Sequence, residues 1–262
     1  MTAKMDAHKI KDAVETSFLA IKNIGGKTNG YQVDYSQIEQ SDPYSIFKQE
    51  IAPQLNYLGL DILEDRSEKL SFWINIYNLL ALDAVVSFQI QKSVTEGFLG
   101  IFQFFRKAAY FIDGQRYSLE AIEHGILRAN NGHPYLLGPQ FRSNDKRKSQ
   151  VIFPIENRIH FALNCASKSC PPISIYESGK LEHQLDVAAR NFVDQETSLS
   201  SKGKSITTSR IFNWYSRDFG GEVGIQNFLI NHLPANDPRQ IFLAGSENCK
   251  IRFSKYKWAL NV

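Results

Sequence analysis

The sequence predicts a mainly helical α+β fold, a single domain that carries a small antiparallel sheet. Segments with apolar residues at helical spacing outnumber those in which apolar and polar residues alternate. Strand and helix patterns do not alternate along the chain, which argues against a doubly wound parallel sheet. Hydrophobic residues make up 43% of the chain and charged residues 22%, a globular balance that excludes disorder and coiled coil as the main architecture.

The N-terminal part begins with an amphipathic helix over residues 6–22. Residues 31–35 alternate like a short strand, and a second helical pattern runs from Pro43 to about Leu58. We divide the chain into an N-terminal helix and turn, residues 1–29, and a following unit, residues 30–262. The two parts are expected to form one compact globular unit.

The clearest predicted element is a helix from about Ser67 to Phe88, which is apolar on nearly all sides and therefore expected at the centre of the core. Asn75 and Asn78 lie three residues apart on one of its faces. Both amides must find hydrogen-bond partners inside the protein. These polar side chains, with Asp83, argue against a transmembrane segment.

The middle of the chain predicts a hairpin followed by a helix. Asp113-Gly114 stands between two β-prone runs, a strong turn signal. Ser118 is expected to cap a helix that continues to about Asn130. The remaining predicted elements are, in chain order, a buried strand over 159–163 with a loop over 164–172, helices over 181–195, 209–219 and 222–233, and a final strand over 250–256.

Charge and motifs exclude several functions. The chain has 30 Lys+Arg and 27 Asp+Glu, and a net charge of +3 is too weak to indicate a nucleic-acid partner. The basic residues within 141–148 are interpreted as a solvated loop. No glycine-rich phosphate loop is present, and no cofactor is expected.

The cysteine count and the N-terminal residues bear on the compartment. Three cysteines, an odd number, favour free thiols in a reducing compartment. The first residues contain no apolar signal segment. The cytoplasm is therefore the default expectation, although an exported chain whose leader had been removed would show the same features.

The segment from Cys165 to Pro172 carries the main chemical signal. A cysteine at the end of a predicted strand lies where a rigid scaffold projects side chains into a site. The thiol is interpreted either as a nucleophile or as an inert buried residue. Zinc binding is disfavoured because Cys165 and Cys170 lack a second ligand pair, and the spacing does not match a redox C-x-x-C motif. No metal site is predicted.

A nucleophilic thiol needs a histidine base. On a regular strand, His160 would lie about 16 Å from Cys165 and on the opposite face, so His160 is expected to satisfy a buried hydrogen bond instead. His124 is the better candidate because the fold can bring it from elsewhere. Helix geometry would let Glu120 orient the imidazole, whereas Glu123 points about 100° away.

Several segments resemble the family of domain of unknown function 547 (DUF547), in an order and spacing that span about residues 30–262. The most specific are Phe72-Trp-Ile-Asn75-Ile-Tyr-Asn78 and His160-Phe-Ala-Leu-Asn-Cys165-Ala-Ser-Lys-Ser-Cys170-Pro-Pro. The others are Val33-Asp-Tyr35, Ser118-Leu with Ile122-Glu-His124 and Ile126-Leu-Arg128, Ile211-Phe-Asn-Trp214-Tyr with Asp218-Phe219, and Tyr256-Lys-Trp258-Ala-Leu-Asn261.

The resemblance implies a relationship to cysteine peptidases and a distant papain-like arrangement. Carried over residue by residue, it gives Cys165 as nucleophile, His124 as base and Glu123 as the orienting acid. The helix spacing alone would give the last role to Glu120. The chain departs from the family pattern at Asn157, where Asp-Pro is usual, and this changes the approach to the predicted strand rather than the site.

The resulting expectation is a cysteine hydrolase of the peptidase or amidase type, acting on a peptide or amide substrate. Asn75, Asn78 or the backbone amide of Ala166 would stabilise the oxyanion or support the structure. The alternative is a non-catalytic domain that binds a peptide or protein partner, with a structural cysteine loop. Aromatic residues within 98–111 would wall the groove or pack in the core.

Overall fold

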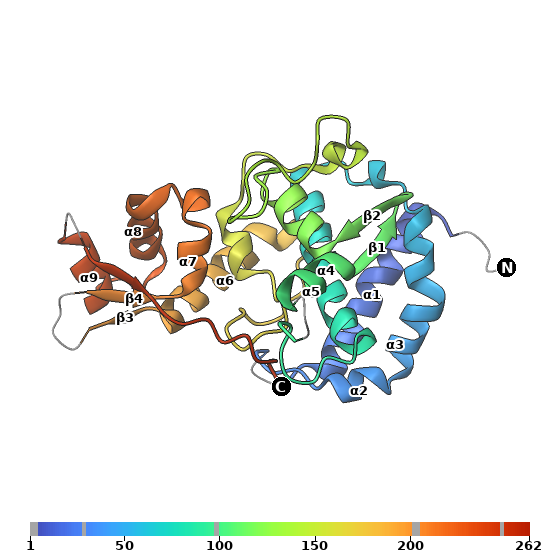
Figure 1. Cartoon of the computed structure of the whole chain (residues 1–262), viewed down its shortest axis with the longest axis horizontal. Helices are drawn as coiled ribbons and strands as arrows, with labels where there is room; N and C mark the ends of the chain where they lie inside the picture. The colour runs from blue at the N-terminus through green and yellow to red at the C-terminus, as the bar shows by residue number, and fades with distance from the viewer. Residues whose placement is uncertain (1–4, 28–29, 97–99, 201–204, 247–248) are drawn as a thin grey trace.

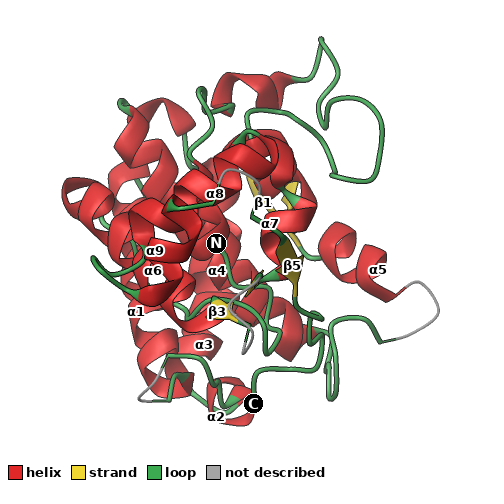
Figure 2. Cartoon of the chain, turned by 90° about the vertical axis from the view of Figure 1, so that its left-hand side faces the viewer, coloured by secondary structure: helices red, strands yellow, loops and turns green. Residues whose placement is uncertain are grey.

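The computed structural model describes residues 5–27, 30–96, 100–200, 205–246 and 249–262. The α-helices are α1 (Ala7–Gly25), α2 (Tyr35–Glu39), α3 (Asp42–Ile46), α4 (Arg66–Ser87), α5 (Gly100–Lys107), α6 (Leu181–Glu196), α7 (Arg210–Trp214), α8 (Gly221–His232) and α9 (Pro238–Ala244). The strands are β1 (Ala109–Ile112), β2 (Gln115–Ser118), β3 (Ser198–Leu199), β4 (Ile206–Thr208) and β5 (Ile251–Phe253). Helices predominate and the strands are short (Figure 2), which confirms the mainly helical α+β prediction.

Helix α4 is the centre of the larger hydrophobic core. The Asp65 side chain accepts from the Glu68 backbone N–H and the Glu68 side chain reaches back, a capping box that fixes the start of the helix. Every residue from Leu70 to Val86 is buried. By length and composition α4 could cross a membrane, but 94% of its most apolar window is buried inside the protein. That environment is the one expected of a core helix.

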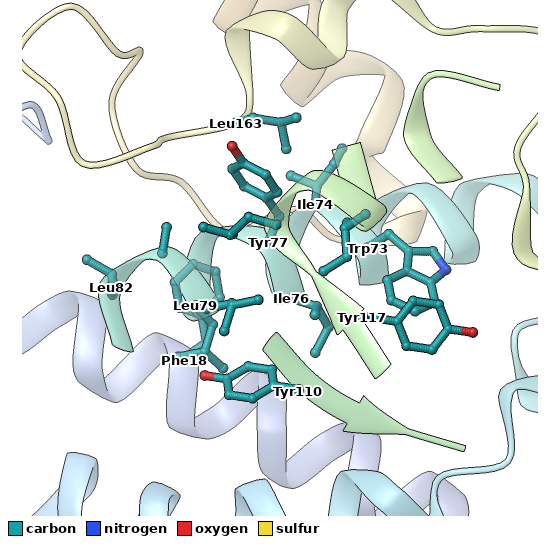
Figure 3. Packing of buried hydrophobic residues seen from close by; sticks show 14 of the residues in the cluster. Phe18, Trp73, Ile74, Ile76, Tyr77, Leu79, Leu82, Tyr110, Tyr117 and Leu163 are labelled. Atoms are coloured by element: carbon teal, nitrogen blue, oxygen red, sulfur yellow. The ribbon is translucent and has the colours of Figure 1, made fainter. Parts of the chain in front are cut away.

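The hairpin predicted at Asp113-Gly114 is present and packs on α4. Strands β1 and β2 pair antiparallel, with Tyr110 opposite Tyr117. The ring of Tyr117 lies 4.7 Å from that of Trp73 on α4 (Figure 3). Helix α4 and the hairpin therefore form one packed unit on which the site is built.

A second, smaller core is aromatic and lies at the other end of the molecule (Figure 1). Phe161, Phe212 and Phe228 are at its centre, with centroid separations of 5.3–5.8 Å. Helices α6 to α9 and the sheet β3-β4-β5 surround it; β3 and β4 pair antiparallel, while β4 and β5 pair parallel.

The C-terminal segment returns from the second core to the first (Figure 1). Leu260 N–H donates to the Lys92 carbonyl, and the Ala259 carbonyl accepts from Lys168 N–H. The Tyr35 hydroxyl donates to Asn261 Oδ1 over 2.7 Å. The chain end thus connects the two cores along the side where the cysteine loop lies.

Two local predictions were wrong, and a third was right only in that the segment is helical. Residues 157–161 form a 3₁₀ helix, capped by the Glu156 side chain, instead of a strand. Residues 31–35 contribute one bridge, between Val33 and Gly26, before α2 begins. The segment from 42 to 57 divides into α3, a π-helical turn and a 3₁₀ helix. Short apolar runs look alike in strands and in buried turns, so packing decides between them.

The aromatic stretch before the hairpin contains α5, which the sequence pattern did not predict. Residues 97–99 of that stretch lie outside the described residues, as do residues 1–4 and 28–29 of the N-terminal part. Helix α9 and strands β3 and β4 were also not predicted.

Candidate functional site

Two adjoining pockets lie between the two cores. The larger has a volume of about 190 Å³ and the smaller about 60 Å³. Both pockets are lined by Phe105, Glu123, Trp214, Tyr215 and Trp258. The larger pocket adds His124 and His133, and the smaller adds His160, Cys165, Cys170 and Tyr256.

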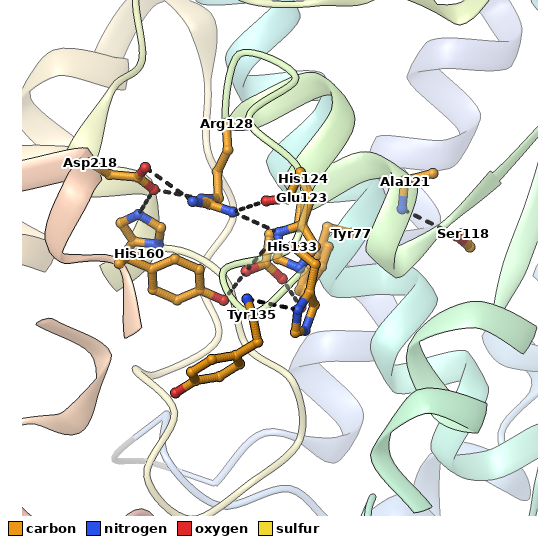
Figure 4. A network of polar contacts seen from close by, with 12 residues as sticks. Tyr77, Ser118, Ala121, Glu123, His124, Arg128, His133, Tyr135, His160 and Asp218 are labelled. Atoms are coloured by element: carbon orange, nitrogen blue, oxygen red, sulfur yellow. Dashed lines mark hydrogen bonds and ion pairs between the residues drawn. The ribbon is translucent and has the colours of Figure 1, made fainter. Parts of the chain in front are cut away.

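The segment that carries Glu123 and His124 is a π-helix, η4 (Ala121–Leu127), rather than an α-helix. The Ser118 hydroxyl accepts from Ala121 N–H, as the capping prediction required (Figure 4). The Arg128 N–H donates to the Glu123 carbonyl over 2.9 Å, five residues back. Single π turns are frequent at functional sites because they reposition side chains that an α-helix would turn away.

Glu123 is buried at the junction of the two pockets. The Tyr77 hydroxyl of α4 donates to Oε2 over 3.0 Å, and the Tyr215 hydroxyl donates to Oε1 over 2.5 Å. Burial by itself would raise the pKa of Glu123, but His124, the Tyr215 hydroxyl and Arg128 outweigh it and hold that pKa below its ordinary value. Glu123 is therefore a carboxylate at neutral pH.

The hydrogen bonds of His124 fix its protonation state. Arg128 Nη1 lies 3.0 Å from His124 Nδ1, and a guanidinium can only donate, so Nδ1 is the acceptor. The ring proton of the neutral imidazole is then on Nε2. Burial, opposed by Glu123 and reinforced by Arg128, lowers the pKa of His124 to about 4. The ring is neutral at physiological pH.

Arg128 belongs to a buried network that joins the two cores (Figure 4). Its guanidinium donates to both oxygens of Asp218, over 2.5 and 3.0 Å, and to the Gly132 carbonyl over 2.7 Å. His160 Nε2 lies 2.9 Å from Asp218, and the His160 ring stacks on Tyr215 with centroids 4.0 Å apart. Burial would raise the pKa of Asp218, but His160 and Arg128 lower it to about 2.

The two loop cysteines face each other. Their Sγ atoms are 2.8 Å apart, and Cys165 N–H donates to Cys170 Sγ over 3.1 Å. The Tyr256 hydroxyl lies 3.2 Å from Cys170 Sγ and 3.4 Å from Cys165 Sγ. Burial would raise the pKa of Cys170, but hydrogen bonds from Cys165, Ser167 and Tyr256 lower it to about 7. The hydrogen bond to Cys170, together with burial, raises the pKa of Cys165.

The short distance between the Cys165 and Cys170 Sγ atoms predicts that a small-molecule disulfide such as oxidised glutathione will convert the two thiols into an intramolecular disulfide. Thiolate exchange would oxidise the two protein thiols and reduce the reagent to two glutathione thiols. Non-reducing peptide mapping should find the 165–170 bridge, and Cys170→Ser should leave a glutathione adduct on Cys165 instead. A stable adduct on Cys165 in the wild-type protein would contradict the prediction.

The candidate acids differ in their partners. Glu120 forms a two-contact ion pair with Arg106, with distances of 2.8 and 3.2 Å. Glu123 Oε1 lies 3.9 Å from His124 Nδ1. Of the two glutamates, Glu123 is therefore the one beside the imidazole. Because Nδ1 accepts from Arg128 and carries no proton, the role of Glu123 as the orienting acid stays a prediction.

The amides expected at an oxyanion site are engaged in the loop. Asn75 bonds to both the N–H and the carbonyl of Tyr176, over 2.9 and 2.8 Å. Asn78 bonds to the Ala162 carbonyl and to Asn164 N–H. The N–H of Ala166, which has a φ of 66°, donates to Asn164 Oδ1 over 2.7 Å. Asn78 and Ala166 therefore support the cysteine loop, whereas Asn75 holds the segment that follows it.

The pairing of Cys165 with His124 stays a prediction, since the two line different pockets of the pair. The contacts of Cys165 Sγ are with Cys170, Ser167 and Tyr256. His160 lines the smaller pocket with Cys165. The distance argument against His160 was wrong because it assumed a strand, whereas the expected buried hydrogen bond of His160 is present, to Asp218.

Sequence reasoning missed Tyr77, Tyr215, Asp218 and Tyr256 as members of the site. Tyr77 lies on α4, and the other three lie after α6, so all four are far in sequence from η4 or from the cysteine loop. The available signal was their position inside segments that resemble the family, such as Trp214-Tyr and Asp218-Phe219. In the described part of the chain, no three His, Cys, Asp or Glu side chains are grouped so that they could hold a metal ion.

Comparison with known proteins gives one match. Residues 61–193 match the family described as "Protein of unknown function, DUF547". The matched region includes α4, the hairpin, η4 and the cysteine loop, but ends before Tyr215 and Asp218. Searches of the curated proteins and of the solved structures found no match.

Proposed function

We propose that this chain, which belongs to the DUF547 family, is a hydrolase of the peptidase or amidase type with Cys165 as its nucleophile. The observation that carries the proposal is the position of the Cys165 thiol. It lines a pocket that adjoins a larger one, and a proton acceptor, Cys170 Sγ, lies 2.8 Å away. Both requirements of a nucleophilic thiol, access and an adjacent base, are met at this atom.

Cys170 is the base in this proposal. The N–H of Cys165 and the Tyr256 hydroxyl stabilise negative charge on Cys170 Sγ, and its pKa of about 7 suits proton exchange at neutral pH. Cys165 Sγ would attack the substrate carbonyl carbon while its proton passes to Cys170. Cys170 would then give that proton to the departing amine, leaving a thioester on Cys165.

Water completes the cycle. Cys170 would accept a proton from a water molecule that attacks the thioester carbonyl. The Sγ–C bond breaks, the carboxylic acid is released and Cys165 recovers its proton. One water molecule is consumed overall. Its hydroxyl ends on the acid, and its proton, passed through Cys170 to Cys165, replaces the proton given to the amine, so the reaction is a hydrolysis.

The structure supports a donor role for His124 instead of the base role expected from the sequence. Arg128 occupies the lone pair of Nδ1, so the group His124 can offer is Nε2–H. A neutral imidazole that donates a hydrogen bond can stabilise a developing oxyanion. Glu123 would then act through electrostatics and through the two tyrosine hydroxyls that it orients.

Iodoacetamide labelling over a pH series tests the proposal, with each cysteine followed by peptide mass spectrometry. We expect Cys165 and Cys170 to be labelled before Cys249, with a rate that rises through about pH 7 because the pair shares one proton. Cys170→Ser should remove the rise near pH 7 from the labelling of Cys165, because the group that titrates there is lost. His124→Gln should leave the labelling rate unchanged and lower the turnover of amide substrates.

The alternative of a non-catalytic binding domain predicts the opposite labelling result. All three cysteines would then stay unreactive until the protein unfolds. Loss of the rise near pH 7 in His124→Gln, with that rise kept in Cys170→Ser, would return the base role to His124. In both cases circular dichroism should establish that the variants are folded.

A further inference from the structure

We infer that the larger pocket binds a cationic group, an ammonium or guanidinium on an apolar stem, with Glu123 as its counter-charge. A role of this ligand as a substrate rests on the proposed function. The binding site does not depend on that function. Three features of the described residues carry the inference: the walls of the pocket, its charges and the state of its histidines.

The walls are mostly aromatic. Trp214 and Trp258 stack with centroids 5.4 Å apart and an interplanar angle of 25°. Phe105, Tyr135 and Tyr215 also line the pocket. The faces of aromatic rings attract cations through their quadrupoles, most strongly in tryptophan and in a desolvated site. A stem of methylene groups also packs favourably on such walls.

Among the charged side chains of the described residues around the pocket, Glu123 is the carboxylate with no direct ion pair to an arginine or lysine. Arg128 is paired with Asp218, and Arg106 is paired with Glu120. Glu123 is held by two neutral phenols and lies 3.9 Å from the neutral His124. Arg128 stabilises this carboxylate only through space, because its hydrogen bonds go to Asp218, His124 and the Gly132 carbonyl, so Glu123 lacks a directly bound cationic partner. A bound cation would supply that partner.

The histidines do not supply the missing positive charge. His124 has a pKa of about 4, and burial also lowers the pKa values of His133 and His160. All three are neutral at pH 7. An anionic ligand would meet Glu123 while both nearby guanidinium groups are engaged elsewhere, and a neutral ligand would bury Glu123 further without compensation.

The test uses Nα-acetyl-arginine amide and its neutral isostere Nα-acetyl-citrulline amide, with Nα-acetyl-lysine amide as the ammonium probe. Binding is measured by calorimetry on the full chain carrying Cys165→Ser, so that no turnover interferes. We expect the arginine probe to bind at least about 10-fold tighter than the citrulline probe. The lysine probe decides whether an ammonium serves as well as a guanidinium.

Two variants examine the two parts of the site separately. Glu123→Gln should remove the preference for the cation while leaving citrulline binding unchanged. Trp258→Leu should weaken binding of the arginine probe through loss of a wall. Glu222→Gln, which makes the same change of net charge on α8 outside the pocket lining, is the matched control and should have no effect.

The inference is overturned if the two isosteres bind equally, if neither binds, or if both Glu123→Gln and Trp258→Leu bind the arginine probe as the parent does. Its failure is distinct from failure of the proposed function. If the pocket binds the cation but Cys165 is unreactive, the hydrolase proposal fails and the cation site is retained. A reactive Cys165 without cation preference would do the reverse.

Discussion

Replacing Asp218 with asparagine is expected to lower the free energy of unfolding by about 3–5 kcal/mol, because it leaves a buried guanidinium without its counter-charge. Asp218 accepts two hydrogen bonds from Arg128, and its Oδ2 also lies within hydrogen-bond distance of His160 Nε2. All three side chains are buried. Urea unfolding followed by circular dichroism measures the change.

A second substitution identifies the cause. Arg128→Met in the Asp218→Asn background should recover part of the lost stability, because the uncompensated charge is removed. Asp186→Asn is the matched control, since the Asp186–Arg190 pair is exposed and such pairs contribute about 0–1 kcal/mol. A loss for Asp218→Asn no larger than that of the control would contradict the central place of this network.

The network also explains the position of the pockets. Arg128 follows η4 on the larger core, while Asp218 precedes α8 on the aromatic core. Their ion pair fixes the relative placement of Glu123 and of Tyr215, whose ring lies under the Arg128 guanidinium at 4.6 Å. A stability determinant and the geometry of the candidate site therefore depend on the same contacts.

The fold was predictable where patterns are long. The long apolar run predicts the helix α4, and Asp113-Gly114 between two β-prone runs predicts the hairpin. Both signals are strong enough that packing contacts do not change the local conformation. The run from Ile159 to Leu163 is short, and its conformation depends on the Glu156 cap and on packing of Phe161 against the aromatic core. Such a segment carries no periodicity that separates a strand from a 3₁₀ helix.

The site was predictable only in part, because its chemistry is assembled across the chain. His124 was predicted from its local pattern and Glu123 from the family resemblance. The tautomer of His124 depends on Arg128, whose orientation depends on Asp218, 90 residues further on. Cys170, the proposed acceptor for the Cys165 proton, was not recognised because the C-x4-C spacing matches neither a metal nor a redox motif.

The second large expected effect is acid destabilisation through His124. Its pKa is about 4 in the folded protein and about 6.5 when exposed. Below pH 6.5 the unfolded chain binds a proton that the folded chain does not, so stability falls as the pH falls through this window. At about 1.4 kcal/mol per unit, the loss from His124 alone amounts to about 3 kcal/mol by pH 4.

His124→Gln isolates this contribution. Glutamine can still accept from Arg128 but does not titrate, so the difference in unfolding free energy between pH 7 and pH 4 should shrink by about 3 kcal/mol. Asp218, with its pKa of about 2, adds its own loss only at lower pH, between about 4 and 2. Parallel pH profiles for wild type and variant would mean that burial and Arg128 do not keep the His124 ring neutral. The neutral donor proposed at Nε2 would then have to be replaced by an imidazolium paired with Glu123.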